Sequence, residues 1–163
     1  MKTKVLSLLV DNTAGVLSRV SGLFSRRGYN IDSLSVGVTE DPKLSRMTVV
    51  VSGDDKILTQ IKSQLSKLVD VRSIIELKDG DSVTRELVLL KIKADANERQ
   101  QIIAVANVYR ASIVDVSPES IMIEITGNNN KVEAFTSLLE GFEIQEIVRT
   151  GVTGLVRGRA EAE

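Results

Sequence analysis

One order of sequence patterns occurs twice in this chain, and this repeat constrains the fold more than any other feature. Apolar residues at a period of two predict strands, and those at a period of 3.6 predict helices. The first half of the chain follows the order strand, helix, strand, strand, helix, strand, in the segments Val5–Val10, Val16–Phe24, Leu34–Val38, Met47–Val51, Ile57–Leu68 and Val69–Leu77.

The same order returns after Lys78–Ser82, a short polar segment that we interpret as a linker. Within the two halves, VSGDDKILTQIKSQL and ITGNNNKVEAFTSLL resemble each other, and in each a glycine closes a strand just before a polar helix start. The elements expected in the second half are Leu87–Ile92, Glu98–Tyr109, Ser112–Val116, Ile121–Thr126, Lys131–Leu139 and Phe142–Val148.

The sequence therefore predicts an α+β protein with two βαββαβ units, each with an antiparallel sheet that carries two helices on one face. We expect residues 159–163 to form a frayed tail, because the end of the chain alternates charged and small residues without an apolar face. An aliphatic sheet face left in water would be adhesive, so we expect it to be covered by pairing within the chain, between chains, or both.

Composition excludes several classes of function. The 163 residues include no Cys and no His, which removes nucleophile schemes based on these residues and the common metal sites. The net charge is −1, and the expected third strand, RMTVVVSG, lacks the aromatic residues that stack on RNA bases, so nucleic acid is not an expected partner. We find no catalytic pair, no metal site and no nucleotide-binding loop.

Apolar segments are too short to suggest a membrane protein. The N-terminal segment MKTKVLSLLVDN is interrupted by Ser7 and ended by Asp11, which leaves it shorter than the core of a signal peptide. No segment approaches the roughly 20 apolar residues of a membrane span. The expected location is the cytoplasm.

The segment from Asp11 to Leu17 is the best candidate for a ligand site, because it leads from a strand directly into a helix start. Free backbone N–H groups at such a position bind a carboxylate, and Gly15 lets a ligand approach the backbone. Asn12 and Asn30 have side-chain oxygens that can accept hydrogen bonds from an ammonium group. These groups together could hold a free amino acid, although glycine and asparagine are also ordinary loop residues.

Several long segments resemble the small regulatory subunit of acetohydroxyacid synthase, also called acetolactate synthase. They are GVLSRVSGLFSRRGYNIDSLSVG, SRMTVVVSGDD, QIKSQLSKLVDV, RELVLLKI, IVDV, EITGNNNKVEAF and IQEIVRTGVTGLVRG. The resemblance implies two ferredoxin-like domains in tandem, namely an ACT domain over residues 4–78 for amino-acid sensing and dimerisation, and a C-terminal domain over residues 83–158.

The resemblance also implies partners. The chain would bind a catalytic large subunit that carries thiamine diphosphate, Mg and FAD, would raise its activity, and would confer feedback inhibition by a branched-chain amino acid, usually valine. No cofactor and no catalytic residue are expected on this chain. The alternative that stays open is a stand-alone ACT-type sensor that acts on another partner, and co-purification with a thiamine-dependent subunit distinguishes the two.

By the resemblance, the effector contacts fall on two groups of residues in a homodimer. One group belongs to the first loop and helix start, and the other lies across the dimer interface. They are Asn12, Ala14, Gly15, Val16 and Leu17 in the first group, and Asn30 and Ile31 in the second. Many relatives have Pro where this chain has Ala14, so the loop is expected to have one φ restraint fewer.

Overall fold

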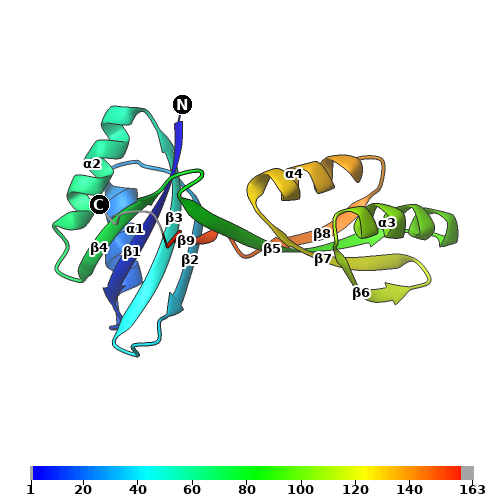
Figure 1. Cartoon of the computed structure of the whole chain (residues 1–163), viewed down its shortest axis with the longest axis horizontal. Helices are drawn as coiled ribbons and strands as arrows, with labels where there is room; N and C mark the ends of the chain where they lie inside the picture. Colours follow the sequence, from blue (N-terminus) through cyan, green and yellow to red (C-terminus); the bar gives the residue numbers. More distant parts are fainter. Residues whose placement is uncertain (1, 159–163) are drawn as a thin grey trace. The chain divides into compact units, whose positions relative to one another are not determined.

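The computed structural model describes residues 2–158 and divides them into two compact units (Figure 1). The first unit contains the chain up to Thr84 together with the segment that starts at Val152, and the second contains Arg85–Gly151. The predicted frayed tail, residues 159–163, lies outside the described residues.

The first unit has the predicted βαββαβ order. Its four strands form an antiparallel sheet in the order β2-β3-β1-β4, and both helices lie on one face of it (Figure 1). The elements are β1 (Lys2–Asp11), α1 (Val16–Arg26), β2 (Ile31–Val38), β3 (Leu44–Gly53), α2 (Asp55–Ser66) and β4 (Val71–Leu77).

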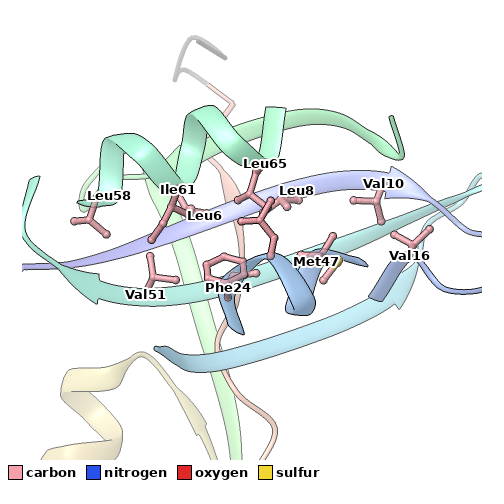
Figure 2. Packing of buried hydrophobic residues seen from close by; sticks show 13 residues of the cluster. Leu6, Leu8, Val10, Val16, Phe24, Met47, Val51, Leu58, Ile61 and Leu65 are labelled. Atoms are coloured by element: carbon pink, nitrogen blue, oxygen red, sulfur yellow. The ribbon is translucent and has the colours of Figure 1, made fainter. Parts of the chain in front are cut away.

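The core of the first unit lies between the sheet and the two helices (Figure 2). Alternate residues of the central strand β1, namely Leu6, Leu8 and Val10, are buried against the helices. Phe24 of α1 packs among them, and the core face of α2 consists of Leu58, Ile61 and Leu65. The apolar residues at periods of two and 3.6 in the sequence therefore form the buried faces of the strands and helices.

The second unit repeats this architecture around a separate core. Its sheet has the order β6-β7-β5-β8. Its elements are β5 (Ser82–Lys93), α3 (Ala96–Val108), β6 (Ser112–Ser117), β7 (Ser120–Gly127), α4 (Asn129–Leu138) and β8 (Ile144–Arg149). Phe135 of α4 is fully buried and meets Tyr109 edge to face, with 5.7 Å between ring centroids. The predicted α+β fold with two βαββαβ units is thus confirmed.

A further strand, β9 (Thr153–Val156), was not predicted from the sequence. It pairs with β5, and it belongs to the first unit together with the first residues of β5, Ser82–Thr84. The structure therefore places residues 152–158 with the first unit, whereas the sequence-based boundary assigned 83–158 to the second. No helix within residues 2–158 is long and apolar enough to cross a membrane.

Candidate functional site

Helix α1 begins without a side-chain cap. Its N-cap residue is Gly15, in the left-handed region at φ 87°, and no side chain accepts a hydrogen bond from the first turn. The other three helices are capped by Asp54, Asp95 and Asn128, whose side-chain oxygens accept from backbone N–H groups at 2.8–2.9 Å.

The free donors of this first turn are the amides of Leu17 and Ser18. Within residues 2–158, neither has a backbone or side-chain acceptor, whereas the Val16 amide donates to the Thr13 carbonyl at 3.4 Å and the Arg19 amide donates to the Gly15 carbonyl at 2.9 Å. The positive end of the helix dipole lies at these two amides. The arrangement can therefore accept a carboxylate.

Asn12 ties the preceding loop to the turn between β2 and β3. Its backbone amide donates to the Lys43 carbonyl at 2.7 Å, and its side-chain Nδ2 donates to the Pro42 carbonyl at 2.9 Å. Because Nδ2 is held by the Pro42 carbonyl, the Asn12 side chain is fixed in orientation, and its Oδ1 stays available to accept a hydrogen bond. Asn12 is exposed, so the acceptor is open to a ligand from solvent.

Two ion pairs surround the loop. Arg19 donates from Nε to Asp70 at 2.5 Å, and Arg72 donates from Nε to Asp11 at 2.7 Å. In both cases the hydrogen bond to the carboxylate raises the pKa of the arginine. A Cβ at Gly15 would lie 2.9 Å from Nη1 of Arg19, so this guanidinium lies directly beside the N-cap.

Sequence reasoning did not identify Arg19. It lies one turn after Gly15, and long side chains in a helix lean toward the N-terminus, which is a signal that could have placed its guanidinium beside the loop. Asp70 carried no comparable signal, because it is distant along the chain and meets Arg19 only through the fold.

Side chains of the predicted first group differ in exposure. Asn12, Ala14 and Gly15 are exposed, and Leu17 is 48% exposed, so they share one surface around the helix start. Val16 is buried in the core, so only its backbone lies at the site.

The second predicted group lies elsewhere in the same chain. Asn30 precedes β2, where its Nδ2 donates to Oδ1 of Asp32 at 2.9 Å, and Ile31 is partly buried against the core. Along β3, the partner of Asp11 is Leu44 and the partner of Ile31 is Val51. At about 3.3 Å per residue, these two ends of the sheet are roughly 23 Å apart. A single chain does not bring the two groups together.

The structure has a cavity of about 300 Å³ between α2 and β4 in the first unit and one of about 320 Å³ on the sheet of the second. Neither is lined by a residue of the two predicted groups. No cluster of three or more acidic residues in positions suited to a metal ion occurs among the described residues.

Comparison with known proteins relates both units to one family. A model described as an AHAS small subunit-like ACT domain matches residues 6–73, and a model of the small subunit of acetolactate synthase matches residues 85–158. The acetolactate synthase small subunit of Mycobacterium bovis is 53% identical over 157 residues, which cover 96% of this chain and 94% of that protein.

The chain belongs to the acetolactate synthase small-subunit family.

Other family members agree over the same span. A probable acetolactate synthase small subunit of Methanothermobacter thermautotrophicus is 46% identical over 96% of this chain and 94% of its own length. The crystal structure of the small subunit from Thermotoga maritima has 41% identity and a TM-score of 0.88, and the match covers 98% of this chain and all of that one. The family resemblance seen in the sequence is therefore confirmed, and the first unit is an ACT domain.

Proposed function

We propose that this chain is the regulatory, non-catalytic subunit of acetolactate synthase, which activates the catalytic subunit and makes it sensitive to inhibition by valine. Membership in the small-subunit family over both units supports the partner. In this proposal the thiamine diphosphate, Mg and FAD belong to the catalytic subunit. The observation that carries the sensing role is the uncapped start of α1, with two free amides beside Gly15.

The amino-acid effector binds in our proposal by its two charged groups. The carboxylate accepts from the amides of Leu17 and Ser18, where the helix dipole favours a negative charge. The ammonium group donates to side-chain oxygens of Asn12 and Asn30. An aliphatic side chain of the effector would contact Leu17, which is an exposed apolar residue at the same place.

Two chains complete this site if their β2 strands pair. β2 is an edge strand, and its last residues include the exposed Val36 and Val38. Val38 pairs with Ser45, next to the Leu44 partner of Asp11, so β2 ends where the loop after β1 begins.

An antiparallel β2 from a second copy would start at the place where this β2 ends. The partner's Asn30 and Ile31 would then lie on the same side as this chain's Asn12 and Gly15. The roughly 23 Å that separate the two groups within one chain thus support a site shared by a homodimer. Analytical ultracentrifugation of the isolated chain tests this, since a persistent monomer in saturating valine contradicts it.

Reconstitution with the catalytic subunit tests the function. We expect the wild-type chain to raise acetolactate formation and valine to reverse this rise. In Asn30→Ala, loss of a hydrogen bond to a charged group, worth about 1.5–3 kcal/mol, lowers valine affinity roughly ten- to a hundredfold. Activation without valine persists, because Asn30 is exposed and contributes nothing to the core.

Asn130→Ala is a matched control, because Asn130 is exposed on α4 of the second unit. An unchanged valine response in Asn30→Ala would remove Asn30 from the site. Absence of any effect of the wild-type chain on acetolactate formation would contradict the regulatory function and favour a sensor that acts on another partner.

A further inference from the structure

The segment Val152–Arg157, here called the C-terminal strap, is held by the open face of the ACT sheet. Leu34 of β2 packs into the core, so its neighbours Ser33 and Ser35 lie on the face opposite the helices. The Oγ of Ser35 donates to the Val152 carbonyl at 3.0 Å, and the Val152 amide donates to the Oγ of Ser33 at 2.7 Å. Both backbone groups of Val152 are thus bound by β2.

The strap also fits closely farther along. A Cβ at Gly154 would lie 2.8 Å from the Val83 carbonyl oxygen and 2.9 Å from a methyl carbon of Leu77, so the position requires glycine. The Arg157 amide donates to the Asp81 carbonyl at 2.7 Å. These contacts define a specific docked position.

One buried polar group on the sheet beside the strap's receptor has no hydrogen-bond partner. Thr48 of β3 pairs with Ser35 on one side and with Ser7 on the other, and it is only 1% exposed. Its Oγ1 has no hydrogen-bond partner in the described part of the chain. A buried hydroxyl without a partner costs free energy, so a movement of the strap that let water reach Oγ1 would recover part of that cost.

The strap's receptor lies on the strand that carries the predicted effector residues. Ser33 follows Asn30 and Ile31 closely, and the pairing of β2 with β3 shifts register between Ile31 and Ser33. Such an irregularity changes the direction of the side chains on its two sides, so the orientation of Ser33 and Ser35 depends on the conformation of the strand start. The strap follows β8 of the second unit after only Thr150 and Gly151.

We propose that the surface formed by Ser33, Ser35 and Leu77 is the receptor for the C-terminal strap, and that effector binding at the start of β2 changes this contact. The signal then reaches the second unit through the strap. This inference rests on the proposed function, because it names the route by which effector binding regulates. It assigns Ser33 and Ser35 to coupling and not to effector binding.

The test uses the full chain with Ser33→Ala and Ser35→Ala combined, reconstituted with the catalytic subunit. Valine binding is measured by calorimetry, inhibition by a valine titration, and strap docking by hydrogen exchange of the amides of Val152–Arg157. We expect strap amides to exchange roughly tenfold faster or more, as follows from the loss of two hydrogen bonds, while valine binding stays within about threefold of wild type. The maximal inhibition by valine falls by at least about half, because the coupling free energy is lost.

Gly154→Ala supplies an independent release of the strap, because its added Cβ would lie 2.8 Å from the Val83 carbonyl oxygen, a backbone atom, and 2.9 Å from methyl carbons of Leu77 and Thr84. We expect Gly154→Ala to give the same faster exchange of the strap amides and the same loss of valine inhibition as the double serine variant. The matched controls are Ser73→Ala, at a half-buried serine of β4, and Gly141→Ala, where a Cβ meets nothing within 4 Å. In both controls the strap amides should exchange at the wild-type rate, and valine should inhibit as it does with the wild-type chain.

Three results overturn the inference. Faster strap exchange with full valine inhibition shows that the strap does not carry the signal, and unchanged exchange in both released variants shows that the receptor is wrong. A loss of valine binding equal to the loss of inhibition assigns the serines to the effector site. A wild-type chain that neither binds valine nor confers inhibition refutes the proposed function itself, which the wild-type titration shows separately.

Discussion

Two glycines of the ACT domain allow the effector site to be tested against a matched backbone change. Gly15 and Gly28 both have positive φ, at 87° and 70°. A Cβ at Gly28 meets nothing within 4 Å, whereas one at Gly15 lies 2.9 Å from Nη1 of Arg19. Alanine at either position therefore imposes the same kind of backbone cost, but only Gly15→Ala changes the surroundings of the free amides.

The shared cost follows from the left-handed conformation. It disfavours a residue with a Cβ by about 1–2 kcal/mol. Loss of glycine's freedom in the unfolded chain offsets about 0.4–1 kcal/mol of this. The net loss is about 1 kcal/mol, which lowers the melting temperature of a unit of this size by roughly 4–8 °C. The Arg19–Asp70 pair adds little to the difference, because the Arg19 side chain is 49% exposed and screened by solvent.

The effector response should separate the two variants. In Gly15→Ala the new methyl group is added at the N-cap, against the Arg19 guanidinium and next to the first turn that carries the free amides of Leu17 and Ser18. We expect valine affinity to fall roughly tenfold or more, as for the loss of a hydrogen bond to a charged group. Gly28→Ala keeps the wild-type affinity. The measurements are scanning calorimetry for stability and titration calorimetry for valine. Equal valine affinities in the two variants, at equal losses of stability, would refute the carboxylate site at α1.

Three further predictions concern the stability of the units. Phe24→Ala lowers the free energy of unfolding of the first unit by about 3–5 kcal/mol, since Phe24 is 1% exposed, and a loss below about 1 kcal/mol in urea unfolding would contradict this packing. Asp95→Ala removes the capping box of α3 and costs the second unit about 0.5–2 kcal/mol, whereas Asp95→Asn keeps a cap and costs less by the same measurement. The hydrogen bond from Lys91 and its charge lower the pKa of Glu146 in the folded protein. The pair therefore stabilises the second unit at pH values above the ordinary glutamate pKa of about 4.3, and this stabilisation is lost as the pH falls through the lower pKa of the folded state. Lys91→Met should raise the Glu146 pKa in an NMR titration.

Elements with strong local patterns could be predicted from the sequence. The helices at Val16 and Asp55 were found because their apolar faces and their starting residues lie close together in the chain. The predicted start of strand β5 was Leu87, but the strand begins at Ser82. Its first residues have no alternating apolar pattern, and β5 pairs there with β9, a strand of the strap. Their structure depends on a segment that lies far along the sequence.

Strand β9 could not be predicted for the same reason. It has only four residues, and Gly154 within it would normally indicate a strand break. The glycine is needed because other parts of the ACT domain approach it closely, which no local pattern reveals. Likewise, the helix start with Asn12 and Gly15 was predicted from neighbouring residues, while the Arg19–Asp70 pair required the fold.

The position of the strap also has a consequence for how the protein is made. The second unit interrupts the first, so a ribosome must synthesise the roughly 70 residues from Arg85 to Gly151 before the strap exists. At about 5–20 residues per second, this interval lasts about 4–14 seconds. During that time Ser33, Ser35 and Leu77 lack their covering segment, and β2 has a bare edge beside them. The four strands of the ACT sheet, β2-β3-β1-β4, are already complete when this interval begins, so the β2 edge can meet a second copy while the strap is still absent.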